Sequence, residues 1–141
     1  RVEDVDSGRS REELRLSGVD WDGEPVRQSG RHALYAEALE QLDAAGLLYE
    51  CFCTRAEIRE AASAPHGELP EGAYPGTCRD LTEAEKAQRR AAGRPPALRV
   101  RAGGFRVGFA DHLRGRTERT LDDFVVRRND GDFAYNLAVT V

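Results

Sequence analysis

Long apolar stretches, methionine and an excess of positive charge are all missing from this sequence. No uninterrupted apolar run approaches the roughly 18 residues that a transmembrane helix requires, and no basic start followed by an apolar stretch marks a signal peptide. We therefore expect a cytoplasmic protein. Its net charge of -4 provides no general attraction for phosphate, so a nucleic-acid partner would have to bind a local basic surface.

Two groups of arginines could form such a basic surface. One group comprises Arg89, Arg90 and Arg94, and the other comprises Arg114, Arg116 and Arg119. For either group taken alone, solvated surface arginines are the more common explanation. The sequence therefore leaves the position of a basic surface open.

Both ends of the chain interrupt what the sequence pattern indicates to be regular structure. Residues 1–6 indicate a strand already under way, and the apolar residues 137–141 predict a buried strand with no turn after it. Because methionine is absent as well, we expect a fragment of a longer protein. The 40% of residues that are hydrophobic suffice for one domain-sized core.

The order of the predicted elements indicates an α/β fold with an added β-rich portion. Helical spacing of apolar residues, with capping residues, predicts helices at 11–16, 29–45, 55–62 and 82–93. Strands are expected at 47–53, 97–101, 105–109, 124–128 and 133–141. Turn residues at 103–104 would join the second and third strands in a hairpin, and those at 129–131 would join the last two. We expect one compact unit with an insertion.

Three cysteines provide the clearest chemical signal: Cys51 and Cys53 at the end of a predicted strand, and Cys78 after a loop rich in glycine and proline. An odd number cannot pair completely in disulfides, whereas thiolates suit a tetrahedral zinc ion. Alternate strand residues lie about 7 Å apart, so a bend would have to bring the first two sulfurs together. From spacing alone, three cysteines acting as small apolar residues are an equally good explanation.

A closed structural zinc site also needs a fourth ligand. The nearby candidates are His66, in the loop, and Tyr74, four residues before Cys78. Chemistry alone favours His66, because imidazole is a common zinc ligand, whereas tyrosine must lose a proton with a pKa of about 10 to bind well.

Several motifs together resemble the class I aminoacyl-tRNA synthetases of the glutamyl type. Residues 1–9 resemble the R-x-E-D-x-D-x-x-R segment of that family, and further matches are W-D at 21–22, Q-S-x-R at 28–31, Y-E-C-F-C-T-R at 49–55 and Y-P-G-T-C-R at 74–79. Residues 127–139 resemble the R-R-x-D-G-x-F-A-Y-x-L-A-V segment of the glutamyl-queuosine tRNA(Asp) synthetases. Protein-charging glutamyl synthetases tend to have P-T-Y-H-x-A-N there. The resemblance covers nearly the whole chain.

This resemblance implies a partial Rossmann-type class I catalytic core, with a zinc-bearing insertion at about 47–82 and a β-rich portion at about 95–141. The implied enzyme is a monomeric ligase that activates L-glutamate with ATP and Mg²⁺ as an aminoacyl adenylate. It then transfers the glutamate to queuosine at the wobble position of tRNA(Asp).

Site residues are implied by the same resemblance. The zinc ligands would be Cys51, Cys53, Tyr74 and Cys78, so the tyrosine replaces His66 as the preferred fourth ligand. Glu3 and Tyr135 would bind glutamate, with Glu3 pairing with the α-ammonium group and Tyr135 offering its hydroxyl. Without the resemblance, a surface acid on a strand and a core aromatic are the preferred explanations for these two residues.

Departures from the family pattern limit what the chain could do by itself. The HIGH-type and KMSKS-type motifs, which bind the ATP phosphates, are absent from the 141 residues, and Thr140 replaces one valine of the family's V-V-D-D segment. Because phosphate-displacing chemistry depends on positioning and electrostatics, we expect the chain alone to be inactive and assign no catalytic residue. The alternatives are a fragment of a protein-charging glutamyl-tRNA synthetase and a non-catalytic, zinc-stabilised module that binds tRNA.

Overall fold

The computed structural model describes residues 7–62 and 73–141. In chain order the elements are α1 (Ser7–Leu16), the 3-10 helix η1 (Gln28–Gly30), α2 (His32–Ala44), β1 (Leu48–Cys51), α3 (Arg55–Ala62), α4 (Glu83–Ala91), β2 (Ala97–Val100), β3 (Arg106–Asp111), β4 (Gly115–Thr120), β5 (Val125–Arg127) and α5 (Tyr135–Ala138). The strand expected at 1–6 lies outside the described residues. Within the described ranges, no helix combines the length and the apolar character needed to cross a membrane.

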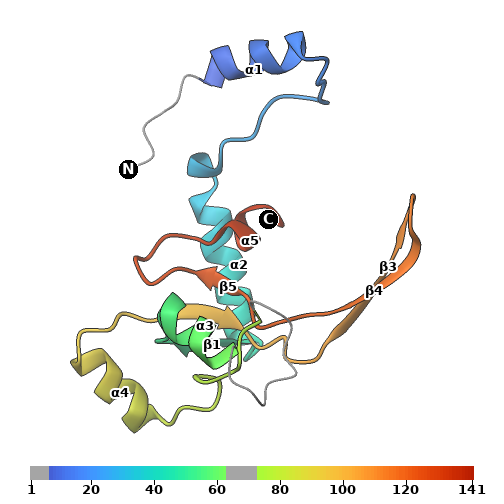
Figure 1. Cartoon of the computed structure of the whole chain (residues 1–141). Helices are drawn as coiled ribbons and strands as arrows, with labels where there is room; N and C mark the ends of the chain where they lie inside the picture. The colour runs from blue at the N-terminus through green and yellow to red at the C-terminus, as the bar shows by residue number, and fades with distance from the viewer. Residues whose placement is uncertain (1–6, 63–72) are drawn as a thin grey trace.

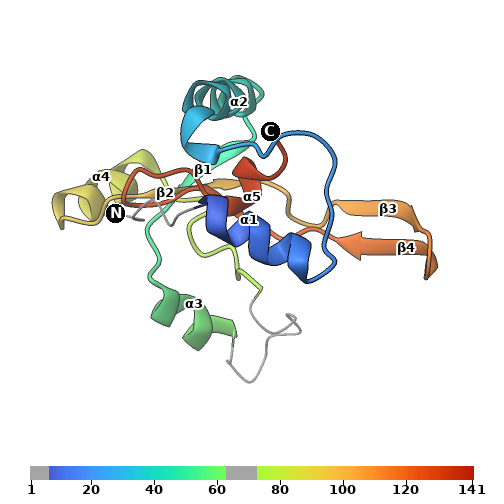
Figure 2. The same ribbon diagram turned by 90° about the horizontal axis from the view of Figure 1, so that it is seen from above.

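A three-stranded antiparallel sheet forms the centre of the molecule, with the strand order β1-β2-β5. In the register of β1 against β2, Tyr49 lies opposite Arg99 and Cys51 lies opposite Ala97. Helices α2 and α3 lie on opposite sides of this sheet (Figure 2). Both faces of the sheet are therefore covered by other parts of the chain.

The alternation of side chains along the strands gives each face of the sheet its own apolar core. On one face, the buried residues are Tyr35, Leu39, Val126 and Leu137, and the partly buried Leu48, Leu98 and Val100 pack against them. On the other face, the buried residues are Tyr49, Cys51, Phe52, Tyr74 and Cys78, with Ile58 and Leu81 packed against them. All three cysteines belong to this second core, since Cys53 packs against it as well.

Strands β3 and β4 form a separate antiparallel hairpin that extends away from the rest of the molecule (Figure 1). Its pairing runs from Arg106 opposite Thr120 to Asp111 opposite Gly115. The expected hairpin between residues 97–101 and 105–109 is therefore wrong, because β2 pairs with β1 and β5 instead. The sequence also failed to predict β4, whose six residues GRTERT contain no apolar side chain.

The strand expected at 133–141 is also wrong. Residues 135–138 form the short helix α5, and only Phe133 pairs with β5, through a single bridge to Arg127. The Thr140 hydroxyl donates to the main-chain oxygens of Asn136 and Leu137, which stabilises the helical turn. A short apolar run does not by itself distinguish a strand from a helix, which explains the error. The predicted turn before it is confirmed, with Gly131 at a φ of 92°.

The four predicted helices are confirmed, although α1 begins at Ser7 and α2 begins only at His32, after η1. Helix α4 starts with the expected capping box, in which the Glu85 N–H donates to the Thr82 hydroxyl and the Glu85 carboxylate accepts from the Thr82 N–H. Thr54 and Glu57 form the same reciprocal pair at the start of α3. In chain order, the first cap follows Cys53 and the second follows Cys78, so each fixes where the chain leaves the second core.

Candidate metal centre and the adjoining pocket

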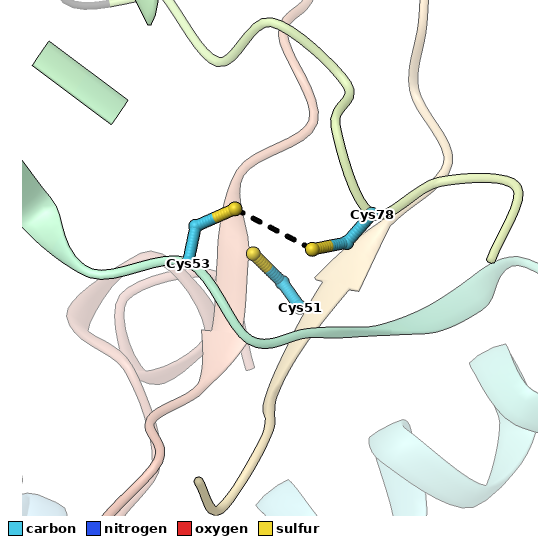
Figure 3. Close-up of side chains that lie close together, drawn as sticks. All are labelled: Cys51, Cys53 and Cys78. Atoms are coloured by element: carbon cyan, nitrogen blue, oxygen red, sulfur yellow. Dashed lines mark hydrogen bonds between the residues drawn. The ribbon is translucent and has the colours of Figure 1, made fainter. Parts of the chain in front are cut away.

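The three cysteine sulfurs meet at the end of β1, where Figure 3 shows them pointing toward one another. All three Sγ atoms lie within 4.8 Å of one another, and the Sγ atoms of Cys53 and Cys78 are 3.4 Å apart. Strand β1 ends at Cys51, so Phe52 and Cys53 lie outside the regular strand, and the Phe52 N–H donates to the Cys78 sulfur over 3.5 Å. The Cys51 and Cys53 sulfurs therefore lie closer together than the distance of about 7 Å between alternate residues of a strand.

The Tyr74 hydroxyl is directed at the same three cysteines. Its oxygen lies 3.4 Å from the Cys51 sulfur and 3.8 Å from the Cys53 sulfur, and it accepts a 2.9 Å hydrogen bond from the Cys78 N–H. Tyr74 is buried, with 3% of its surface exposed, so the hydroxyl has little access to water. The alternative fourth ligand, His66, lies outside the described residues.

These four side chains can be compared with the geometry that zinc requires. Zinc–sulfur bonds of about 2.3 Å in a tetrahedron place two sulfurs about 3.8 Å apart, and a zinc–oxygen bond of about 2.0 Å places oxygen about 3.5 Å from sulfur. The 3.4 Å between the Cys53 and Cys78 sulfurs is close to the first value, and the 3.4 and 3.8 Å from the Tyr74 oxygen to the Cys51 and Cys53 sulfurs are close to the second. These three separations match a closed tetrahedral site of three sulfurs and one oxygen, and all three sulfurs lie within 4.8 Å of one another.

The protonation of these groups follows from their burial. Burial, with a hydrogen bond to Cys78, raises the pKa of the Cys53 thiol to about 12. Burial and the hydrogen bond to Cys51 raise the pKa of the Tyr74 hydroxyl as well. Burial would also raise the pKa of Cys78, but hydrogen bonds from the Phe52 N–H, Tyr74 and Cys53 outweigh it and hold that pKa below its usual value. A cation that binds the Cys53 sulfur as a thiolate must therefore displace its proton.

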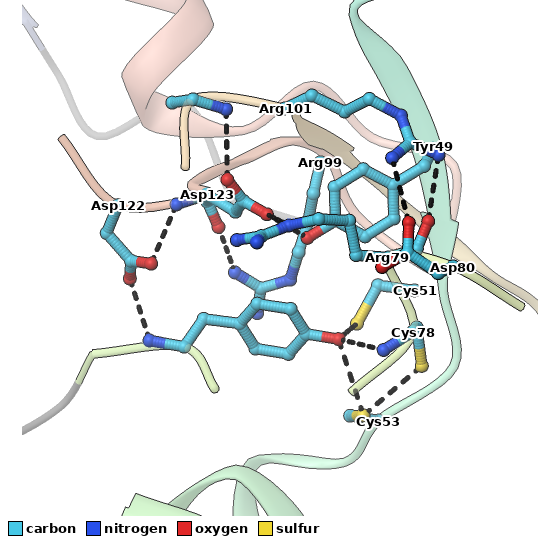
Figure 4. Close-up of polar contacts among 12 residues, drawn as sticks. Tyr49, Cys51, Cys53, Cys78, Arg79, Asp80, Arg99, Arg101, Asp122 and Asp123 are labelled. Atoms are coloured by element: carbon cyan, nitrogen blue, oxygen red, sulfur yellow. Dashed lines mark hydrogen bonds and ion pairs between the residues drawn. The ribbon is translucent and has the colours of Figure 1, made fainter. Parts of the chain in front are cut away.

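A buried carboxylate, Asp123, supports this cluster (Figure 4). It accepts hydrogen bonds from the Tyr49 hydroxyl at 2.6 Å, from Arg79 Nε at 2.8 Å and from the Ala102 N–H at 2.9 Å. Burial opposes its ionisation, but Tyr49 and Arg79 hold the pKa of this carboxyl below its ordinary value. Asp123 thereby ties β1 to the chain on both sides of the β3–β4 hairpin and to the residue after Cys78.

Its neighbour Asp122 holds the chain at Tyr74, four residues before Cys78, because the Asp122 Oδ2 accepts a 2.8 Å hydrogen bond from the Tyr74 N–H. Sequence reasoning missed both aspartates. The available signal was two adjacent acids directly before the apolar residues 124–126, a position where a carboxylate at a strand start can accept main-chain hydrogen bonds.

A pocket of about 940 Å³ opens beside the cysteines and reaches α5. Its lining includes Cys53, Arg94, Arg99, Arg128 and Tyr135. Tyr135 is 73% exposed, so it is not the core aromatic that the sequence alone would favour. Glu3, the other residue expected to bind glutamate, lies outside the described residues. The structure therefore describes one of the two expected glutamate-binding residues, at the wall of a pocket.

The two candidate basic surfaces differ in their partners. Beside α4, Arg90 forms an ion pair with Glu50, and Arg94 pairs with Glu57 at 2.9 Å. On the hairpin, Arg106 and Arg116 both approach the single carboxylate of Glu118. Arg119 donates instead to the main-chain oxygen of Glu118. On the hairpin two arginines thus share one carboxylate, whereas beside α4 Arg90 and Arg94 each have a carboxylate of their own.

Comparisons with known proteins place these features in a family. The chain is 54% identical to a protein from Nocardia farcinica and 43% identical to one from Symbiobacterium thermophilum, both named glutamyl-Q tRNA(Asp) synthetase. Each match covers all of this chain but only 47% and 50% of the relative. The chain therefore spans about half the length of these curated relatives.

Solved structures give a consistent result. The crystal structure of a glutamate tRNA ligase from Elizabethkingia meningosepticum, in complex with its amino acid, matches with a TM-score of 0.65 and 25% identity, over 96% of this chain and 31% of that one. The glutamate-tRNA synthetase of Elizabethkingia anophelis matches with a TM-score of 0.68 and 26% identity, over 96% of this chain and 32% of that one. The family described as tRNA synthetases class I (E and Q), catalytic domain, matches residues 1–141, and the chain belongs to this family.

Proposed function

We propose that this chain is part of an enzyme that activates L-glutamate with ATP and Mg²⁺ and transfers it to queuosine in tRNA(Asp). The observation that carries the proposal is the 54% identity, over the whole chain, to the glutamyl-Q tRNA(Asp) synthetase of Nocardia farcinica. That match includes residues 127–139, where the motif resembles the glutamyl-queuosine enzymes. In this proposal residues 1–141 are a partial catalytic domain of Rossmann type, monomeric and cytoplasmic. The zinc-bearing insertion lies at about 47–82 and the β-rich portion at about 95–141.

The direct test uses the protein encoded by the complete gene, with labelled glutamate, ATP and Mg²⁺. We expect label on tRNA(Asp) that contains queuosine, and none on tRNA(Asp) that contains guanosine at the wobble position. Label on tRNA(Glu) instead would contradict the proposal. That outcome would support the second candidate, a protein-charging glutamyl-tRNA synthetase, which the similarity to the two glutamate tRNA ligase structures favours.

We further propose that Cys51, Cys53, Tyr74 and Cys78 hold one structural zinc ion. The support is the approach of the Tyr74 oxygen to the sulfurs and the match of these separations to a tetrahedron. When bound, zinc would supply cross-linking of β1 to the loop before α4, and no chemistry at the substrate. Native mass spectrometry of the freshly purified chain should find one zinc ion per molecule. A chain that carries no zinc, even after incubation with it, would refute the site.

The identity of the fourth ligand can be tested with two variants. Tyr74→Phe keeps the buried ring but removes the oxygen, so we expect zinc affinity to fall. His66→Ala is the matched control, and we expect zinc affinity to stay at the wild-type value. The opposite result, with affinity lost in H66A and retained in Y74F, would make His66 the ligand.

For the amino acid itself, we propose that Glu3 binds the α-ammonium group of glutamate and Tyr135 offers its hydroxyl. The support for Tyr135 is its exposed position on the wall of the pocket beside the cysteines. In the complete enzyme, Tyr135→Phe should raise KM for glutamate more than it lowers kcat. An unchanged KM would remove Tyr135 from the site.

For the tRNA, we propose the β3–β4 hairpin rather than α4 as the basic surface. The support is that Arg106, Arg116 and Arg119 share the single residue Glu118, whereas Arg90 and Arg94 each have a carboxylate partner. If the chain were only a tRNA-binding module, this surface alone would account for its function. Binding of the 141-residue chain to tRNA with a steep salt dependence, and no activity in the complete protein, would support that alternative.

A further inference from the structure

Arg99 is a buried cation in the middle of β2. Only 8% of its surface is exposed, and it lies on the same face of the sheet as Tyr49 and Cys51, because it pairs with Tyr49 in the register of β1 and β2. Arginine is almost never this buried without a partner of opposite charge. Its neighbours along the strand, Leu98 and Val100, pack in the opposite core. A specific reason is therefore needed for a charge at this position.

Hydrogen bonds within the described chain do not neutralise this charge. Arg99 Nη1 donates to the main-chain oxygen of Asp123, and Nε has no hydrogen-bond partner among the described residues. None of the ion pairs formed in residues 7–62 and 73–141 includes Arg99. The Asp123 carboxylate accepts instead from Tyr49, Arg79 and the Ala102 N–H, as Figure 4 shows.

The guanidinium group of Arg99 lies directly beside the candidate metal centre. Its Cζ atom is 3.8 Å from the centroid of the Tyr74 ring, a cation–π contact, while the hydroxyl of the same ring points at the cysteines. One aromatic ring thus separates Arg99 from the three sulfurs. A guanidinium group has no acceptor atom and cannot bind a metal ion, so any role for Arg99 at the centre must act through its charge or its stacking.

With zinc bound, the cysteine centre would carry a charge opposite in sign to that of Arg99. Three thiolates carry more negative charge than a divalent ion can neutralise, whether Tyr74 binds as a phenol or as a phenolate. A zinc ion held by these residues would therefore form a buried group with net negative charge. In a medium of low dielectric constant, a buried cation close to such a group stabilises it.

We propose that Arg99 is the cation that compensates the charge of the zinc centre and holds the Tyr74 ring against it. This inference rests on the proposed zinc site. It assigns to Arg99 a positioning and electrostatic role, without contact to the metal. In this proposal the zinc-bound thiolates supply the negative charge that faces the buried guanidinium group, which explains why Arg99 needs no carboxylate partner.

The test is the zinc dissociation constant of the 141-residue chain, measured by competition with a chromophoric chelator. Arg99→Met keeps the length of the side chain but removes the charge, and Arg99→Gln also keeps a donor for the Asp123 oxygen. We expect both to weaken zinc binding about ten- to a hundredfold, as for other residues that support metal ligands. Arg99→Lys keeps the charge but loses the planar group that stacks on Tyr74, so its zinc affinity should fall less than that of R99Q.

Arg101→Met is the matched control. Arg101 also stacks on an aromatic ring, that of Tyr49 at 5.0 Å, but it is exposed and pairs with Asp80 at 3.5 Å. We expect its zinc affinity to equal that of wild type. Far-UV circular dichroism of each metal-free variant identifies any that fail to fold, and the comparison of R99Q with R99K remains decisive if R99M is one of them.

The outcomes separate this inference from the zinc site itself. If wild type binds zinc and R99Q binds it equally tightly, the role of Arg99 is overturned and the zinc site stands. If R99K is weakened as much as R99Q, charge compensation is overturned. If wild type binds no zinc, the proposed metal site falls, and the inference about Arg99 falls with it.

Discussion

Replacing Asp123 by a residue of the same shape should lower the free energy of unfolding substantially. It is completely buried and accepts hydrogen bonds from Tyr49, Arg79 and Ala102. Asp123→Asn removes the charge and turns one acceptor into a donor that faces other donors. We expect the free energy of unfolding to fall by about 2–4 kcal/mol in urea denaturation, at the lower end because Arg79 is partly exposed. The exposed Asp130→Asn should change it by less than about 0.5 kcal/mol; an equal loss in both variants would contradict this assignment.

The same carboxylate predicts how stability depends on pH. Tyr49 and Arg79 hold the pKa of Asp123 below its ordinary value in the folded protein. A depressed folded pKa stabilises the protein above the unfolded pKa of about 3.9, and this stabilisation is lost as the pH falls through the folded value. The difference in unfolding free energy between wild type and D123N should therefore be constant from about pH 7 to pH 5 and shrink below about pH 4. A difference that persists unchanged at the lowest pH at which both fold would show that Asp123 acts without its charge.

Among single residues, the sequence predicted those with distinctive chemistry, and it missed charged residues that are buried only in the folded chain. Three cysteines identify themselves by type, and the motif around Tyr74 identified it by resemblance. Asp123 and Arg99 are ordinary surface residue types, and their burial depends on partners distant in sequence. The alternation along β2 indicated a half-exposed strand, but both faces of this strand are covered, so polar alternation did not mean exposure to solvent.

Among the elements, the β3–β4 hairpin depends most on a single backbone conformation. Gly115 begins β4 with a φ of +70°, opposite Asp111, whose carboxylate accepts from the Leu113 and Arg114 N–H groups at 2.8 Å. Gly115→Ala would place a β-carbon in a left-handed conformation and should destabilise the hairpin by about 1 kcal/mol. Because the hairpin extends from the body, the effect should be local: its amide hydrogens should exchange about fivefold faster.

Gly108→Ala is the matched control for this hairpin. Gly108 lies in β3 without a positive φ, and an added Cβ would meet only Glu118 Cγ at an ordinary 3.7 Å. Its hairpin amides should exchange at the wild-type rate or more slowly. Equal acceleration in the two variants would mean that any side chain at a hairpin glycine is harmful, and that the turn conformation is not the cause.

The hairpin also shows why some elements could not be predicted. Helices α3 and α4 could be predicted from their capping residues, Thr54 and Thr82, because caps act between residues close in sequence. Strand β4 lies in an exposed hairpin and has no apolar face. It therefore lacks the apolar alternation by which strands are recognised in a sequence. Helix α5 had the opposite problem: Leu137 is buried against the sheet, and burial alone fits either kind of element.

For the molecule as a whole, the proposed zinc ion should link metal concentration to stability. The second core consists largely of the residues around the cysteines, so a metal bound there stabilises one whole side of the sheet. A ligand that binds only the folded state, present at a hundred times its dissociation constant, adds about 2.7 kcal/mol to the free energy of unfolding. We expect an increase of this size, or less if unfolded cysteines also bind zinc, when urea unfolding is compared at defined free zinc and with a chelator.

Cys78→Ser should abolish this zinc-dependent increase, because one of three thiolates is lost and the Phe52 N–H loses its sulfur acceptor. His112→Ala, on the exposed turn of the hairpin, is the control for zinc binding at an unrelated imidazole and should retain the full increase. If C78S gains as much stability from zinc as wild type does, the metal acts elsewhere in the chain. If both variants and wild type gain nothing, the second core is stable through its apolar packing and the Asp123 hydrogen bonds alone, and the three cysteines are small buried side chains.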